Sequence, residues 1–575
     1  MLGTFPGPGS VRRTGFGLAD VAVTLGALVL LALVARVGAG SLVAFSPPHN
    51  LPTVSLDPRL LPYYAARSTL RMFAGLLWSL GFTLVYAYAA AKSRKAERIL
   101  VPLLDILQSV PVLGFLSITV TGFIALFPGS LLGLEFASIF AIFTAQAWNM
   151  TFSFYQSLRT IPKELDEAAT LYGLSAWQRF VKLELPNGAI GLVWNTMMSF
   201  GGGWFFVAAS EAISVLNQKY TLPGLGSYVQ AAVDAKDLYA LGLALLTMGI
   251  VIVVVDQLVW RPLVAWSDRF RLEQSASASA PTSWVYSLLR DAHVLRLIED
   301  ALRPASDFVG RFLSALTKPR ARKEPHRASI IVDRVYDAVL LGLVVVLTAV
   351  GLHFVLTTVG FGEVFKTLGL GLATLARVLT LLVFASVVWT PVGVAIGFNR
   401  RLAHVLQPVV QFLASFPANF IFPFATLFFL SYHVNINYGC ILLMALGAQW
   451  YVLFNAIAGA QSIPTELREM ADDFGVTGRL RWHKLIGPGI FGSWVTGAIT
   501  ASGGAWNASI VAEVVSWGDK TLTATGLGTY IADATGKGDW PRITLGVSIM
   551  SLYVVGMNRT VWRRLYRIAE TRYHL

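Results

Sequence analysis

The chain has 575 residues, of which 55% are hydrophobic and only 13% are charged, and its formal net charge is +13. Because soluble proteins carry about 25% charged residues, this composition excludes an ordinary soluble domain and indicates a protein of the lipid bilayer. The basic residues form short clusters beside apolar runs, as in cytoplasmic membrane loops. This placement excludes nucleic acid as a partner.

Apolar windows of about 20 residues, the length that crosses a bilayer, predict twelve membrane helices. They cover approximately 18–40, 66–91, 100–125, 133–157, 188–212, 238–264, 334–358, 371–397, 404–430, 436–460, 490–514 and 541–562. Basic clusters such as Arg12 with Arg13, Lys92–Arg98 and Arg559–Arg567 fall on one side of these helices. Both termini are therefore expected in the cytoplasm.

The helices divide into two units of six, at 1–267 and 331–575, joined by a cytoplasmic linker at 268–330. The linker begins with a flexible composition at Gln274–Pro281. An amphipathic helical stretch follows from Trp284 to Leu316, and then the basic run Lys318–Lys323. Two interpretations stay open: the helical stretch lies on the inner leaflet, or it is a solvated spacer.

The two units are copies of one another. The segment Ile161–Gly173 recurs without a gap at Ile463–Gly475, 302 positions later. Other related positions are Trp204 with Trp506, Glu211 with Glu513 and, at an offset of 306, Arg71 with Arg377. Because each unit has six helices, both units cross the membrane in the same direction. This makes a parallel repeat, and the solute pathway is expected between the halves.

Each repeated segment is polar and lies between the fourth and fifth predicted helices of its unit. An acidic residue follows a proline, which suits a helix start, and a glycine that can make a sharp turn ends the segment. In the first copy, Glu167-Ala-Ala is followed by Gly173 and then by Leu183-Glu-Leu-Pro186. This pattern resembles the EAA loop of binding-protein-dependent ABC importer permeases. The second copy departs from it, with Met470 in place of the first alanine.

The resemblance implies an all-α integral membrane protein of the type I ABC importer permease fold. It also implies that each segment is a coupling helix seated in a groove of an ATP-binding subunit. The implied coupling residues are Glu164, Glu167, Ala168, Ala169 and Gly173 in the first copy, and Glu466, Glu469, Ala471 and Gly475 in the second.

A finer resemblance is to the nitrate, sulfonate and taurine branch of these permeases. It rests on a Gly/Ala-Trp pair, a following glutamate and a Gly-Leu-Gly loop, present here as Gly203-Trp204, Glu211 and Gly224-Leu-Gly226, and as Ala505-Trp506, Glu513 and Gly526-Leu-Gly528. The resemblance implies a fused two-unit permease in a bacterial inner membrane. It would import a small solute such as nitrate, sulfonate, taurine or bicarbonate with an extracytoplasmic binding protein and two ATP-binding subunits.

The chain itself is not expected to be an enzyme. It carries no phosphate-binding G-x-x-x-x-G-K-[ST] loop, so ATP and Mg²⁺ are expected on the partner subunits, and no cofactor is expected here. Its single cysteine, Cys440, excludes an intrachain disulfide, and no Cys/His spacing suits a metal.

Ionisable and large aromatic residues within spanning segments are candidates for the solute pathway. They are Arg71, Trp204, Glu211, Arg377, Trp506, Asn507 and Glu513. The arginines either attract an anion or reach to the interface. The glutamates either act at a gate or binding-protein contact, or accept hydrogen bonds from the following loop. The aromatic residues and Asn507 either line the pathway or pack between helices.

Two rival functions remain at this point. A fused ferric-iron ABC permease would have the same helix count but calls for oxygen-rich ligands. A secondary transporter driven by an ion gradient would place paired charges along the membrane midplane and need no ATPase.

Overall fold

The computed structural model describes residues 17–41, 43, 52–109, 112–114, 116–215, 218–270, 283–317 and 328–572. Three features of the sequence lie outside these residues: Arg12 with Arg13, the flexible stretch 274–281 and the basic run 318–323. The described chain is almost entirely helical, with two short β-hairpins, and its halves repeat the same order of elements.

The first half begins with long helices and carries one hairpin near its end. Its elements are α1 (Leu18–Ala39), α2 (Leu61–Lys92), α3 (Arg94–Ser109), α4 (Leu116–Leu126), α5 (Leu132–Arg159), α6 (Lys163–Leu171), α7 (Ala176–Arg179), α8 (Leu185–Glu211), β1 (Ala212–Val215), β2 (Gln218–Thr221), α9 (Leu225–Asp234), α10 (Leu238–Val255) and α11 (Arg261–Ser267).

The linker forms two helices, α12 (Trp284–Asp291) and α13 (His293–Leu316). The second half then follows. Its elements are α14 (Ala328–Thr358), α15 (Phe361–Phe398), α16 (Arg400–Ser415), α17 (Phe422–Ser431), α18 (Ile436–Ser462), α19 (Thr465–Asp473), α20 (Gly478–Arg481), α21 (Gly487–Ala512), β3 (Val514–Trp517), β4 (Lys520–Thr523), α22 (Leu527–Lys537), α23 (Trp540–Met557) and α24 (Arg563–Arg572).

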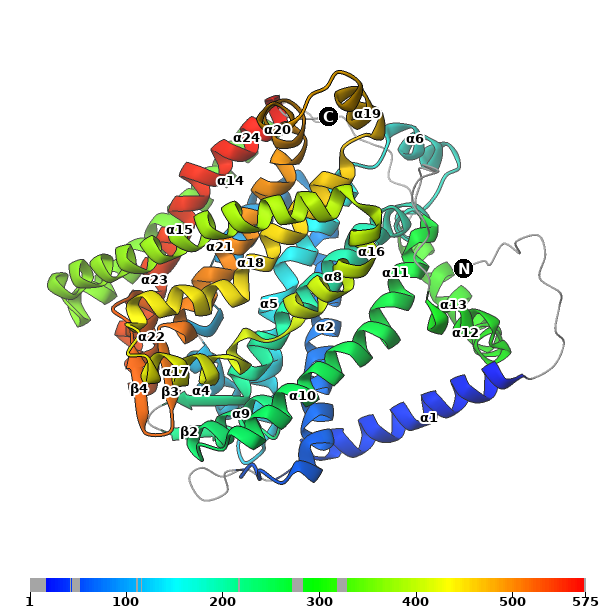
Figure 1. The fold of residues 1–575 in the computed structure, drawn as a ribbon. Helices are drawn as coiled ribbons and strands as arrows, with labels where there is room; N and C mark the ends of the chain where they lie inside the picture. The colour runs from blue at the N-terminus through cyan, green and yellow to red at the C-terminus, as the bar shows by residue number, and fades with distance from the viewer. Residues whose placement is uncertain are drawn as a thin grey trace.

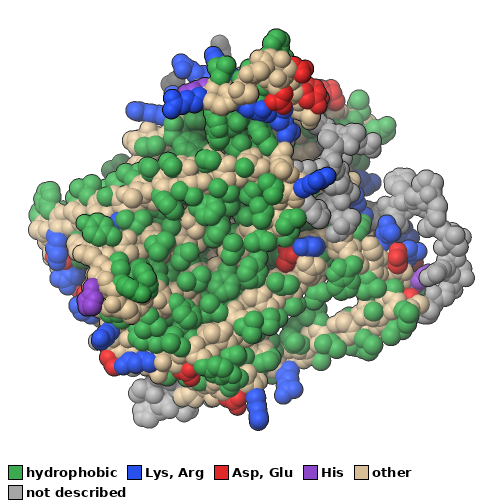
Figure 2. All heavy atoms as spheres, in the orientation of Figure 1, with side chains coloured by type: hydrophobic (Ala, Val, Ile, Leu, Met, Phe, Trp, Pro, Cys, Tyr) green, Lys and Arg blue, Asp and Glu red, His purple; other side chains and the backbone are tan. Residues whose placement is uncertain are grey.

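The repeat extends to packing. Helix α5 lies between α2 and α8 in the first half, as α18 lies between α15 and α21 in the second. Each hairpin is antiparallel, with Ala212 opposite Thr221 and Val514 opposite Thr523. In Figure 1, α6 and α19 lie at one end of the bundle and the strands with α9 and α22 lie at the other. Figure 2 shows hydrophobic side chains over the broad middle of the visible face, with charged side chains gathered toward its ends, as a bilayer-spanning protein requires.

Six stretches of the described residues are long and apolar enough to cross a membrane. They are Leu18–Ala39, Pro58–Lys92, Leu238–Phe270, Phe361–Phe398, Ile436–Ser462 and Trp540–Ala569. Three further predicted spans are continuous helices that carry more buried polar residues: α5, α8 and α21, with 28, 27 and 26 residues.

The predicted continuous spans at 100–125 and 404–430 are wrong. In both places an amphipathic helix of 16 residues, α3 or α16, is followed by a break and a short apolar helix, α4 or α17. The break in the second half occurs at Phe416 and Pro417, where Phe416 is extended at φ −73° and ψ 126°. Proline lacks an N–H and disfavours a helical residue before it.

Candidate functional site

The two repeated polar segments form short helices at one end of the bundle. Helices α6 and α19 each have nine residues, and Pro162 and Pro464 stand directly before them. Glu164 and Glu167 in the first copy and Glu466 and Glu469 in the second are exposed. Each helix therefore presents carboxylates outward. One in each copy, Glu164 or Glu466, lies near the positive N-terminus of its helix.

A glycine reverses the chain after each short helix. Gly173 and Gly475 both have φ of +63°, a left-handed conformation that only glycine adopts without strain. No atom lies within 4 Å of the place where a Cβ would stand on either glycine. The backbone conformation, not the available space, is therefore what requires glycine here.

Ala169 and Ala471, two of the residues that the family resemblance implies in coupling, do not lie on the outer surface. Both are buried, because the chain after each turn folds back over them. The N–H of Leu174 donates to the Ala169 carbonyl at 3.1 Å, and the N–H of Val476 donates to the Ala471 carbonyl at 2.8 Å. Ala168 is half-buried. The small side chains thus permit the sharp return of the chain rather than the approach of another surface.

Exposed apolar residues at the end of each short helix were not identified from the sequence. Tyr172 and Phe474, which occupy equivalent positions, are 84% and 78% exposed, and Leu171 and Met470 are exposed beside them. The signal in the sequence is an aromatic residue directly before the turn glycine in both copies. Apolar side chains that project into solvent from a polar loop are typical of a protein contact.

One arginine ties each short helix to the helix that follows it. Arg179 forms an ion pair with Asp166 of α6, and Arg481 forms one with Asp472 of α19. The two arginines are related by the 302-residue offset, whereas the carboxylates stand at different positions of the two helices. Each ion pair thus connects a short helix to the helical segment that continues into α8 or α21.

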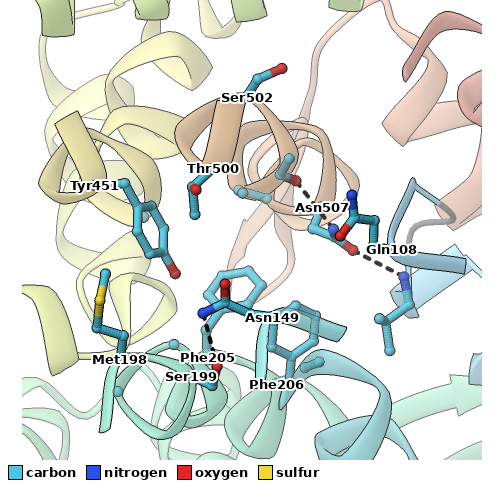
Figure 3. Close-up of a pocket in the computed structure, with 18 of the residues that line it drawn as sticks. Gln108, Asn149, Met198, Ser199, Phe205, Phe206, Tyr451, Thr500, Ser502 and Asn507 are labelled. Atoms are coloured by element: carbon cyan, nitrogen blue, oxygen red, sulfur yellow. Dashed lines mark hydrogen bonds between the residues drawn. The ribbon is translucent and has the colours of Figure 1, made fainter. Parts of the chain in front are cut away.

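A cavity of about 250 Å³ lies between the two halves. Its walls come from α3, α5, α8, α16, α18, α21 and α23, from the breaks that follow α3 and α16, and from residues 558–562 after α23. Figure 3 shows Asn149, Tyr451, Thr500 and Asn507 around a common space, with the Tyr451 hydroxyl directed into it. Every described side chain that lines the cavity is uncharged, and the polar ones carry amide groups, hydroxyl groups or an indole N–H.

Two hydrogen bonds join the halves beside the cavity. The N–H of Val112 donates to Asn507 Oδ1 at 2.9 Å, and Asn419 Nδ2 donates to the Phe205 carbonyl at 3.2 Å. The two acceptors occupy equivalent positions, because Phe205 stands where the second half has Asn507, but the two donors do not, because the equivalent of Val112 is Ala418. The lining is therefore asymmetric, which a single fused chain permits.

The buried arginines and glutamates pair with one another and stand away from this cavity. Arg71 Nη1 lies 2.7 Å from Glu211 Oε1, and Arg377 Nη1 lies 2.8 Å from Glu513 Oε1. Each glutamate also accepts from the following loop, Glu211 from the N–H of Gly226 at 2.7 Å and Glu513 from the N–H of Thr529 at 3.2 Å.

The Gly-Leu-Gly loops pack directly on these carboxylates. A Cβ on Gly224 would stand 2.3 Å from Glu211, and one on Gly526 would stand 2.2 Å from Glu513. The second glycine of each loop is as restricted, since a Cβ there would meet the α8 or α21 backbone at 2.4 Å. The glycines therefore allow each loop to reach the carboxylate, and the carboxylate fixes the loop at the end opposite α6 and α19.

The first half has a second ion pair that the second half lacks. Glu135 accepts from Arg71 Nε at 2.5 Å and from Arg71 Nη2 at 2.8 Å, and it also pairs with Arg67. By the same offsets, Asn437 stands in place of Glu135 and Ala373 in place of Arg67. Both networks are therefore electrically neutral, as burial requires.

The tryptophans among the pathway candidates are packed within the helices. Trp204 is buried against Phe200, with ring centroids 5.6 Å apart, and Trp506 is stacked on Tyr553 at 6.1 Å. Of the seven candidates, only Asn507 lines the cavity. Sequence reasoning did not identify five other residues that line the cavity: Gln108, Asn149, Ser199, Tyr451 and Thr500. Each is a single polar residue within a helix, and no pattern in the sequence distinguishes it.

The halves also meet at the end that carries the hairpins. Lys236 Nζ lies 2.7 Å from Asp519 Oδ2, and the N–H of Gly518 donates to the Val233 carbonyl at 3.1 Å. The hydrogen bond from Lys236 lowers the pKa of Asp519 below its usual range. The turn of the second hairpin thus contacts the end of α9. Among the described residues, no three His, Cys, Asp or Glu side chains form a group that could bind a metal ion.

Two segments of the chain match one protein family. Residues 81–261 and 389–573 each match the model of the binding-protein-dependent transport system inner membrane component. The chain belongs to this family. It contains two permease units of the family in one polypeptide, and each match includes one short helix, α6 or α19, and one buried glutamate, Glu211 or Glu513.

Permeases with named solutes are among the similar proteins. The bicarbonate transport system permease protein CmpB of Synechococcus elongatus is 28% identical over 163 residues, which is 28% of this chain and 55% of that protein. The putative aliphatic sulfonates transport permease protein SsuC of Bacillus subtilis is 27% identical over 165 residues, or 28% and 55%. The nitrate import permease protein NrtB of Leptolyngbya laminosa is 24% identical over 189 residues, or 33% and 64%. The matched segments thus span about half to two thirds of these permeases.

Proposed function

We propose that this chain is the membrane subunit of an ATP-driven importer for a small anion. Two ATP-binding subunits would bind at α6 and α19, and their closure on ATP would move the two halves between inward-facing and outward-facing states. An extracytoplasmic protein would deliver the solute at the opposite end of the bundle. Both termini would then lie in the cytoplasm.

The observation that carries this proposal is the pair of equivalent short helices at one end of the bundle. Each has exposed carboxylates, an exposed aromatic residue at its end, and an arginine that links it to the membrane helix behind it. A secondary transporter has no need for two such protruding helices. The family match supports the same function, because its members are components of binding-protein-dependent transport systems.

The substrate class rests on the similar permeases and is compatible with the cavity. Bicarbonate, nitrate and sulfonates, which the names of those permeases give, are all small oxyanions. The described cavity lining offers amide and hydroxyl donors at Asn149, Tyr451, Thr500 and Asn507. Neutral donors bind an oxyanion without the strong attraction of a lysine or arginine, so the solute can leave again. The described lining has no carboxylate, which a ferric-ion pathway would call for.

The hairpin end of the bundle is the proposed contact for the binding protein. Lys236 and Asp519 join the two halves there and are both exposed. A binding protein that docks over this contact would reach both halves at once. Opening of the outer side would separate the two residues.

Purification with the ATP-binding subunit encoded nearest to the chain tests the proposal. The wild-type chain is expected to retain two ATP-binding subunits. Each single variant, Gly173→Trp or Gly475→Trp, should retain one subunit, and the double variant should retain none. Gly242→Trp is the matched control. A Cβ on Gly242 also meets nothing within 4 Å, but Gly242 lies in the membrane helix α10, away from the short helices. A wild-type chain that retains no ATP-binding subunit and transports after ATP depletion would refute the proposal.

A further inference from the structure

The linker helix α13 has two sharply separated faces. Ile298, Leu302, Val309 and Phe312 recur at helical spacing along one stripe, and Arg303 lies on the opposite side. The apolar stripe is uncovered: Leu302 is 61% exposed, Val309 48% and Phe312 57%. A helix with this pattern would be unstable as a solvated spacer, because water would surround its apolar side.

The start of α13 is attached to a membrane helix. Asp20 of α1 accepts from the N–H of Val294 at 2.8 Å, and thereby supplies the cap that α13 lacks within its own sequence. Helix α1 is long and apolar enough to cross a membrane and is almost wholly exposed, as a lipid-facing helix is. Figure 1 shows α12 and α13 beside the first-residue end of α1, and both contact it. The start of α13 therefore lies beside the first-residue end of a helix that is long and apolar enough to cross a membrane.

The other end of α13 contacts the segment that follows the first short helix. The Thr317 carbonyl accepts from the N–H of Ala176 at 3.2 Å, and the Thr317 hydroxyl accepts from the N–H of Trp177 at 3.3 Å. A Cβ on Gly310 would stand 3.9 Å from Trp177 Nε1. Gly310 belongs to the polar side of α13, so the polar side is the one next to α7. The apolar stripe is directed away from α7.

We propose that α13 binds the surface of the membrane, with its apolar stripe inserted among the lipid headgroups and its polar side toward α7. A lipid surface fits because it is continuous with the exposed surface of α1, to which α13 is capped. Through Thr317, the bound helix supports α7, which follows the first short helix α6, from the membrane side. Among the described residues, α20, the equivalent of α7 in the second half, has no such attachment to α13.

Fluorescence quenching on the full chain in lipid nanodiscs tests this inference. In a Cys440→Ala background, which removes the only native cysteine, bimane is attached at Val309→Cys on the apolar stripe or at Arg303→Cys on the polar side. The discs contain brominated phosphatidylcholine with phosphatidylglycerol, and unbrominated discs serve as the reference. A near-isosteric change at Val309 preserves the fold, and a normal elution profile confirms it.

The expected result is loss of fluorescence at position 309 in brominated discs and little loss at position 303. Iodide in the water should quench in the opposite order. Strong iodide quenching at both positions would overturn the inference in favour of a solvated spacer. Shielding of position 309 from both quenchers would overturn it in favour of a protein, such as a second copy of the chain, on the apolar stripe.

Discussion

Glu135 can be replaced by asparagine, the residue that the second half has at the equivalent position, Asn437. The Glu135 side chain is 5% exposed and accepts from both Arg67 and Arg71. Without it, two buried arginines face a single carboxylate, Glu211, and the network has one uncompensated positive charge. We therefore expect Glu135→Asn to lower the free energy of unfolding by about 3–5 kcal/mol, the usual effect of removing one partner from a buried ion pair.

The double variant Arg67→Ala with Glu135→Asn restores neutrality and reproduces the composition of the second network. It should cost only about 1–2 kcal/mol, mainly from lost packing of the arginine stem. Arg67→Ala alone leaves an excess carboxylate and should be worse than the double variant. The double-mutant cycle thus predicts a coupling of at least about 2 kcal/mol in the favourable direction.

Unfolding of the purified chain in mixed micelles, followed by circular dichroism across a denaturant titration, measures all four forms. Arg377→Ala in the second half is a positive control, because it removes the cation of the simpler network. Additive effects of the two single changes would refute the argument from charge neutrality. A double variant as stable as Glu135→Asn alone would refute it as well.

Three further outcomes are expected. Gly475→Ala should reduce ATP-coupled transport, because a non-glycine residue at a φ of +63° is strained by about 1–2 kcal/mol. Gly475→Asn should have a smaller effect, and equal effects of the two variants in a transport assay would contradict this reason. Tyr172→Ala should weaken the binding of an ATP-binding subunit, as measured by titration. It should leave the thermal stability of the chain unchanged, because the Tyr172 ring is 84% exposed; a fall in stability would indicate a packing role instead. Lys236→Glu should weaken the contact between halves, and Lys236→Glu with Asp519→Lys should restore it, as measured by cross-linking. Because the hydrogen bond from Lys236 lowers the pKa of Asp519, its carboxylate stays charged even below the usual pKa of about 3.9. The Lys236→Glu effect should therefore be the same at pH 6 and pH 8 and be lost only in strong acid; a change between pH 6 and pH 8 would contradict the pairing.

Local patterns in the sequence predicted much of the fold. The gapless repeat placed α6 and α19, and Gly173 and Gly475 make the expected sharp turns, in a left-handed conformation. The same reasoning failed at 404–430, because a hydropathy window averages over the amphipathic helix α16 and the apolar helix α17. The break at Pro417 is a local feature that such an average conceals.

Long-range contacts lay beyond the sequence. Arg71 and Glu211 are 140 positions apart, so no local pattern indicated that each neutralises the other. The burial of Ala169 depends on how the chain folds back after Gly173, which helical spacing does not encode. The cavity residues Asn149 and Tyr451 occupy equivalent positions of the two halves but differ in chemistry. A search for repeated residues therefore passes over these cavity residues.

Uptake by the reconstituted system tests the central claim most directly. The chain, its ATP-binding subunit and its binding protein are placed in liposomes, and entry of labelled nitrate, bicarbonate and an aliphatic sulfonate is followed with ATP or a non-hydrolysable analogue on the side of α6 and α19. The account predicts that one of these oxyanions accumulates only with hydrolysable ATP, and that the double variant Gly173→Trp with Gly475→Trp abolishes accumulation. Accumulation that an ion gradient drives without ATP, or that the double variant retains in full, would contradict it.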